Sequence, residues 1–324
     1  MELQAILGNL LSPMILAFLL GIVATLLKSD LKFPEELYLS LTIYLLIAIG
    51  LKGGYKLSLV PFAEVYKPLG FALILGALIP VWSFMILRYL GHFDVPNAAA
   101  IAAHYGSVSA ATFSATLAFL DAHQTAYEGY MPGLLAVLEV PAILVAIFLA
   151  KLLDKSGKTG SLSEVMRELL TGKSTVLLVG CLAIGLLAGK SGWEQVAPFF
   201  DAPFRGILML FLLEAGLVTG RRLKDLKRVG FFLIGFGIVM PFLHSLLGLA
   251  VAKWSGLSMG GAMIFAVLMA SASYIAAPAA CRVALPQASP TYYLTASLAV
   301  TFPFNIIVGL PIYYELAEWF YRAS

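Results

Sequence analysis

Long apolar runs separated by short polar breaks set the pattern of this chain. Each run approaches the roughly 20 residues that an α-helix needs to cross the hydrocarbon core of a bilayer. The pattern predicts an all-α polytopic membrane protein with ten transmembrane helices. These helices are expected near residues 11–28, 35–54, 68–89, 95–120, 130–152, 174–190, 203–221, 230–253, 259–284 and 291–318. The breaks leave no room for a separate soluble domain, and the longest of them, 153–173, is expected to be a loop.

Composition agrees with this class. The chain has 324 residues, of which 60% are hydrophobic and only 12% charged, whereas a soluble domain carries about 25% charged residues. This shortage of charge excludes an ordinary soluble enzyme and a disordered chain, and the net charge of +3 is too small for a nucleic-acid binder. The two cysteines, Cys181 and Cys281, lie in apolar stretches and are interpreted as core residues, with no metal site.

The distribution of Lys and Arg predicts the orientation in the membrane. Fourteen of these residues follow odd-numbered spans and seven follow even-numbered ones. Because basic residues concentrate in cytoplasmic loops, both ends of the chain are expected outside and the 153–173 loop in the cytoplasm.

Matched features in the two halves indicate an internal duplication. Gly-Leu-x-x-Gly occurs at 50–54 and again at 216–220, small and hydroxyl residues fill 106–112 and 271–280, and Pro141 corresponds to Pro303. Five spans per half is an odd number, so the second half must start on the opposite side of the membrane. We therefore expect two inverted five-helix repeats, 1–152 and 174–324, joined by the cytoplasmic linker 153–173.

The runs at 106–112 and 271–280 are the strongest candidates for a functional site. Small residues remove side-chain bulk at mid-membrane depth, and Pro278 removes a backbone donor. A helix that breaks and resumes there presents free N–H groups and a partial positive charge at its new N-terminus. Two such ends suit a small anion, with hydroxyl donors from Ser107, Ser109, Thr112, Ser271 and Ser273. The alternative is close helix packing through small residues.

Ionisable groups inside predicted spans are the next candidates. Glu139 and Glu214 lie at a depth where a carboxylate is costly and is usually functional or paired. Each could bind a coupling cation, stay protonated, or pair with Arg205 or Arg282. His104 could relay protons, although a hydrogen-bonded structural role is the simpler interpretation. No nucleotide-binding loop or catalytic motif occurs in the sequence, so neither an enzyme nor an ATP-driven pump is expected.

The sequence resembles the SbtA-type sodium-dependent bicarbonate transporters of autotrophic bacteria. The resemblance covers nearly the whole chain and rests on seven stretches: Ser12-Pro13, 50–54, 106–112, 139–142, 203–206, 270–282 and 286–290. It implies a core domain that slides against a gate domain, broken fourth and ninth helices, a homotrimer in the bacterial inner membrane, and a PII-like regulatory partner. It places bicarbonate and sodium between the broken helices, with no other cofactor.

Carried over residue by residue, the resemblance completes the predicted sites. The predicted anion site comprises Gly106, Ser107, Ser109, Thr112, Ser271, Ser273, Tyr274, Ala276 and Ala277, with backbone up to 279. The predicted cation-coupling residues are Glu139, Glu214, Ser109 and Ser273. The chain departs from the family pattern at Tyr274, where an Asp is usual, at 109–112 and 277–279, where glycines and a hydroxyl are replaced, and in the shorter 153–173 loop.

The leading interpretation is a secondary transporter that imports bicarbonate by an elevator-like movement, coupled to a cation. Two alternatives stay open. One is transport of another small anion or carboxylate on the same scaffold, which the Tyr274 departure favours. The other is a membrane sensor that transports nothing.

Overall fold

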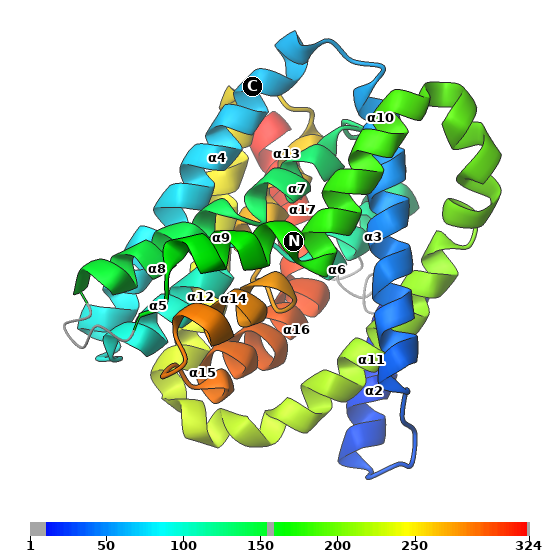
Figure 1. Cartoon of the computed structure of the whole chain (residues 1–324). Helices are drawn as coiled ribbons and strands as arrows, with labels where there is room; N and C mark the ends of the chain where they lie inside the picture. The colour runs from blue at the N-terminus through cyan, green and yellow to red at the C-terminus, as the bar shows by residue number, and fades with distance from the viewer. Residues whose placement is uncertain (1–10, 154–158, 323–324) are drawn as a thin grey trace.

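Helices form the regular elements that the computed structural model defines in residues 11–153 and 159–322 (Figure 1). Residues 154–158, within the predicted linker, and both chain ends lie outside the described residues. The first half contains α2 (Pro13–Leu26), α3 (Glu35–Leu57), α4 (Phe62–Met85), η1 (Ile86–Leu90), α5 (Val95–Gly106), α6 (Ala110–Ala122), α7 (Met131–Leu138) and α8 (Pro141–Leu153). The second half contains α9 (Leu162–Thr171), α10 (Lys173–Phe200), α11 (Phe204–Arg222), η2 (Leu223–Asp225), α12 (Leu226–Trp254), α13 (Met259–Ala270), α14 (Ala276–Ala284), α15 (Pro290–Thr295), η3 (Ala296–Thr301), α16 (Phe302–Phe304), η4 (Asn305–Gly309) and α17 (Leu310–Arg322).

Several of these helices are long and apolar enough to cross a membrane. The described part of the chain contains six such stretches, and α2 and α13 are shorter apolar helices. One stretch, Phe204–Trp254, has 51 residues, and the chain bends within it at Gly230, whose φ of 77° lies in the left-handed region that favours glycine. The prediction of an all-α polytopic membrane protein is confirmed, while the count of ten crossings and the inversion of the halves stay predictions.

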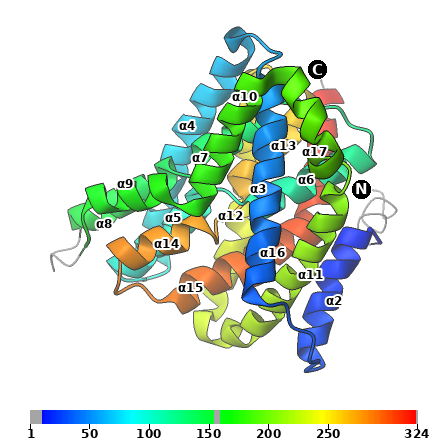
Figure 2. The ribbon, with the colours of Figure 1, turned by 45° about the vertical axis from the view of Figure 1, so that its right-hand side comes forward.

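One bundle consists of α2, α3, α10 and α11, which stand together in both views of the ribbon (Figure 2). Helix α10 packs along α3, and α11 packs along α2. A Cβ added to Gly216 or Gly21 would overlap a carbonyl oxygen of the facing helix, and the same holds for Gly54 and Gly185. The repeated Gly-Leu-x-x-Gly motif therefore lets two pairs of helices approach to backbone contact, as small residues do in membrane bundles.

The second bundle holds the broken segments. Helix α5 packs against α4 and α8, and α13 packs against α12 and α17. Both α5 and α13 are buried on every side, over residues 97–106 and 260–270. Helices of small and apolar residues can take this central position because they have no face that needs water.

The linker between the halves contains a helix where a loop was expected. Helix α9 buries Val165 and Leu169 and exposes Glu164 and Arg167. The Ser161 side chain caps its N-terminus by accepting a hydrogen bond from the Ser163 backbone N–H. The expectation of a loop over 153–173 was therefore wrong for these residues, because the linker carries an amphipathic pattern with a helix cap.

Candidate functional site

The two small-residue runs each interrupt a helical segment, as predicted. Helix α5 ends at Gly106 and α6 begins at Ala110, while α13 ends at Ala270 and α14 begins at Ala276. The serines that follow α5 and α13 have nearly the same extended backbone, with φ −89° and ψ 171° at Ser107 and φ −83° and ψ 161° at Ser271. The two breaks therefore begin with the same local geometry.

The breaks are held together by hydrogen bonds between them. The Ser109 backbone N–H donates to the Ser271 hydroxyl at 3.1 Å, and this hydroxyl donates to the Leu268 carbonyl at 3.0 Å. In the reciprocal direction, the Ser273 backbone N–H donates to the His104 carbonyl at 2.8 Å. Backbone groups freed by each break are thus satisfied by the other break, which is how a low-dielectric interior tolerates irregular chain.

Helices α6 and α14 both begin at this crossing. The Ser109 side chain accepts hydrogen bonds from the Thr112 backbone N–H at 3.2 Å and the Thr112 hydroxyl at 3.0 Å. The Ser273 hydroxyl accepts from the Ala277 backbone N–H at 3.3 Å. Each new helix therefore has one N–H of its first turn paired with a serine, and its partial positive charge is directed at the crossing.

A small cavity lies between these helix ends. Its lining comes from α3, the two breaks, the α7–α8 junction and α10: Leu46, Val108, Ser109, Ala110, Glu139, Ser174, Ser273, Tyr274, Ile275 and Ala276. Its volume is about 10 Å³, which is room for about one water molecule. We call it the crossover cavity. A larger anion occupies it only if its walls move apart.

Glu139 supplies a carboxylate to the crossover cavity. It lies at the junction of α7 and α8 and is 5% exposed. Its Oε2 accepts hydrogen bonds from the Thr175 hydroxyl at 3.1 Å and the Ser174 hydroxyl at 3.3 Å, and its carbonyl accepts from the Ser107 hydroxyl at 3.2 Å. None of the ion pairs among the described residues includes Glu139. A buried carboxylate with only neutral donors suits a cation or a proton as its partner.

Tyr274 brings a second polar group to the cavity. Its ring packs edge-on against Phe302, with centroids 5.4 Å apart. Its hydroxyl is buried near the Ser109 side chain and has no hydrogen bond of good geometry within the described part of the chain. A polar group left poorly paired inside a protein costs free energy.

The remaining predicted residues surround the cavity without lining it. Ser107, Thr112, Ser271 and Ala277 are buried in the breaks and first helical turns. Gly106 serves packing, because an added Cβ would lie 2.7 Å from both Pro80 and Ala142.

Neither Glu214 nor His104 lines the crossover cavity. Glu214 on α11 accepts a hydrogen bond from Arg221 at 2.9 Å, so its basic partner is neither Arg205 nor Arg282. Its other carboxylate oxygen is buried without a partner among the described residues. His104 is fully buried, stacks on Tyr293 with centroids 4.5 Å apart and has its Nδ1 2.6 Å from the Ala100 carbonyl, as in the structural role, but its Nε2 is buried without a partner among the described residues.

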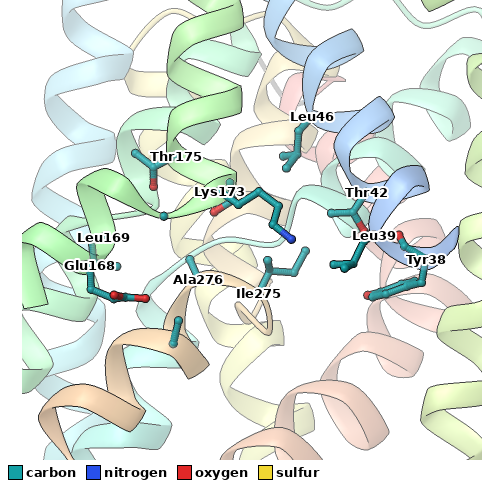
Figure 3. Close-up of a pocket in the computed structure, with 13 residues that line it drawn as sticks. Tyr38, Leu39, Thr42, Leu46, Glu168, Leu169, Lys173, Thr175, Ile275 and Ala276 are labelled. Atoms are coloured by element: carbon teal, nitrogen blue, oxygen red, sulfur yellow. Dashed lines mark hydrogen bonds between the residues drawn. The ribbon is translucent and has the colours of Figure 1, made fainter. Parts of the chain in front are cut away.

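A larger cavity adjoins the crossover cavity, and we call it the vestibule. It has a volume of about 300 Å³ and shares Leu46, Ser174, Ile275 and Ala276 with the crossover cavity. Its other lining residues are Tyr38, Leu39, Thr42, Glu168, Leu169, Gly172, Lys173, Thr175 and Ala279 (Figure 3). Sequence reasoning did not identify Lys173, Tyr38 or Thr42 as site residues. For Lys173 the signal that could have identified it is the polar Lys-Ser-Thr sequence at 173–175, where the sixth predicted span begins.

Another cavity lies at the opposite end of α3. It has a volume of about 410 Å³ and is lined by Lys52, Asp121, Asp201 and Arg205 among others. Lys52 contacts Asp201 at 2.7 Å, and Arg205 contacts Asp121 at 3.7 Å. The second pair joins α6 of the second bundle to α11 of the first. Hollows therefore lie at both ends of α3, and the vestibule is the one that shares lining residues with the crossover cavity.

Comparison with known proteins identifies the family of the whole chain. The family model described as "Na+-dependent bicarbonate transporter superfamily" matches residues 13–318. None of the curated proteins matches the chain.

Proposed function

Because the chain belongs to the Na+-dependent bicarbonate transporter superfamily, a family of transporters and not of enzymes, we propose that it imports bicarbonate together with sodium. The observation that carries the proposal is the crossover cavity. The starts of two helices and the Glu139 side chain line the same small space, so an anion and a cation would occupy adjacent positions there once its walls move apart.

The anion is proposed to bind where the crossover cavity meets the vestibule. Backbone N–H groups at the starts of α6 and α14 and the Tyr274 hydroxyl are suitable donors for the oxygens of bicarbonate. The predicted residues Ser109, Ser273, Tyr274 and Ala276 line this space. Bicarbonate is larger than water, so loading requires the breaks to separate from α3 and α10.

The cation is proposed to bind at Glu139. Sodium prefers oxygen ligands, as other hard cations do, and the Ser174 and Thr175 hydroxyls lie beside the carboxylate. A cation here offsets the charge of the anion, so that the loaded site moves through the membrane near neutrality. The family pattern has an Asp at the position of Tyr274. In this chain Glu139 is therefore the acidic residue that lines the cavity.

The arrangement of the bundles supports an inverted repeat and an elevator movement. The glycine contacts pair α2 with α11 and α3 with α10. If α2 corresponds to α10 and α3 to α11 in the two repeats, exchanging the repeats turns the first pair into the second. The four helices would form the fixed gate domain, and the bundle with the breaks would form the moving core. Hollows at both ends of α3 fit a site that is reached from alternate sides.

The remaining expectations belong to the same proposal. The chain would lie in a bacterial inner membrane as a homotrimer, with both ends outside and α9 in the cytoplasm. Helix α9 would be the surface for a PII-like regulatory protein, because it carries the longest polar segment of the linker. Transport of a different small carboxylate is the second candidate function, favoured by Tyr274 in place of an acidic residue.

Uptake of labelled bicarbonate into proteoliposomes tests the proposal. We expect uptake with an inward sodium gradient and little uptake with a potassium gradient of equal size. Ser109→Leu should abolish uptake, because the side chain would fill the crossover cavity, while Ser40→Leu on the exposed part of α3 should transport normally. Absence of wild-type uptake under sodium, potassium and proton gradients would refute bicarbonate as the substrate. Competition by a panel of carboxylates then tests the second candidate.

A further inference from the structure

Lys173 has an unusual position in the vestibule. It is the first residue of α10, a helix of 28 residues. A lysine there repels the partial positive charge of the helix N-terminus, where acidic residues are stabilising. Helix stability therefore does not explain a lysine at this position.

The ammonium group of Lys173 has no protein partner in the described part of the chain. No ion pair or hydrogen bond joins its Nζ to a described residue. Glu168 also lines the vestibule, but the Lys173 side chain extends away from it toward the α3 wall with Leu39 and Thr42 (Figure 3). Lys173 is an exposed residue, so its positive charge lies at the solvent-accessible side of the vestibule and faces the vestibule space.

Around this charge the vestibule is largely apolar. Leu39, Leu46, Leu169 and Ile275 line it, and apolar walls focus the field of a charge into the water between them. The Tyr38 hydroxyl, on the α3 wall that Lys173 approaches, forms no hydrogen bond with a described residue either; its ring stacks on Phe211. One cation and one free hydroxyl donor thus share a cavity of about 300 Å³ with the Glu168 carboxylate and with three hydroxyls that already donate hydrogen bonds.

From these observations we infer that Lys173, with the Tyr38 hydroxyl, forms a second anion-binding site in the vestibule, where a small oxyanion pauses between bulk water and the crossover cavity. The inference rests on the proposed function for the identity of the oxyanion. Lys173 is directly followed by Ser174 and Thr175, which contact Glu139. An anion at Lys173 would therefore lie next to the residues that hold the proposed coupling carboxylate. A lysine suits a temporary site, because an ammonium is a point charge without the two-pronged grip of an arginine.

Charged thiol reagents test the field of this site without relying on transport. The full chain is purified with Cys181 and Cys281, both free and buried, replaced by alanine, and with Ala279→Cys in the vestibule. We expect an anionic methanethiosulfonate to react faster than a cationic one of similar size. Lys173→Gln should lower the ratio of the two rates by about 10-fold, and Lys173→Arg should keep it. The matched control is Lys227→Gln, at an exposed lysine outside the vestibule.

Bicarbonate itself tests binding at the site. At equal ionic strength, bicarbonate should slow the anionic reagent at Ala279→Cys more than chloride does, and this difference should disappear with Lys173→Gln and shrink with Tyr38→Phe. Three results overturn the inference: no reaction of Ala279→Cys with either reagent, an unchanged rate ratio in Lys173→Gln, or equal effects of bicarbonate and chloride. Failure of bicarbonate uptake by the wild type instead refutes the proposed function, so the two failures are distinguishable.

Discussion

The Thr175 hydroxyl on α10 donates a hydrogen bond at 3.1 Å to the carboxylate of Glu139 at the α7–α8 junction. This contact joins the glycine-packed bundle to the bundle that contains the helix breaks. In the proposed elevator movement, the carboxylate would travel with one bundle while its hydroxyl partners stay with the other, so the contact would link cation binding to the relative position of the bundles.

Replacing Glu139 tests this link. Glu139→Gln keeps the size of the side chain and removes its charge. Because a hydrogen bond to a charged group contributes about 1.5–3 kcal/mol, we expect gradient-driven bicarbonate uptake to fall at least about 10-fold. Uptake is measured in proteoliposomes under a sodium gradient. Glu164→Gln on the exposed face of α9 is the matched control and should transport normally. Full activity of Glu139→Gln would assign the carboxylate a structural role only.

Removing the Ser271 hydroxyl tests the mutual support of the two breaks. Ser271→Ala takes away the acceptor of the Ser109 N–H, and a buried donor left unpaired costs about 1–3 kcal/mol. We expect a lower melting temperature in detergent, read by intrinsic fluorescence. Ser40→Ala, at an exposed serine whose hydroxyl contacts only the Glu36 carbonyl of its own helix, should melt like the wild type. Equal melting of both variants would show that the crossing does not depend on this bond.

Two Tyr→Phe variants separate ligand binding from stability. The Tyr274 hydroxyl has no partner in the described residues, whereas the Tyr313 hydroxyl donates to Asn305 at 2.9 Å. Tyr313→Phe should therefore lower the free energy of unfolding by about 1 kcal/mol, and Tyr274→Phe should leave it unchanged or raise it. If Tyr274 donates to the anion, Tyr274→Phe also raises the half-saturating bicarbonate concentration several-fold in the uptake assay. Loss of stability in Tyr274→Phe would instead reveal a structural bond of its hydroxyl.

The glycine contacts between helices give a prediction about packing. Gly216→Ala places a methyl group against the carbonyl oxygen of Phe18, and overpacking of this kind costs about 1–3 kcal/mol. Gly70→Ala on α4 has nothing within 4 Å of the added carbon, and alanine stabilises a helix by about 0.5–1 kcal/mol relative to glycine. The two variants should shift the melting temperature in opposite directions. Equal shifts would show that α2 and α11 separate easily at this contact.

The sequence by itself determined the membrane class, the apolar segments, the interruptions at 106–112 and 271–280, and Glu139 as an acidic residue near them. These features follow from hydropathy and from local backbone chemistry, which depend on neighbouring residues. Only the tertiary structure decided which residues meet. It paired Ser109 with Ser271, placed Glu139 beside Ser174 and Thr175, joined Glu214 to Arg221 and directed Lys173 into the vestibule. Such contacts join residues up to 162 positions apart, and they depend on how the helices pack, which no local pattern specifies.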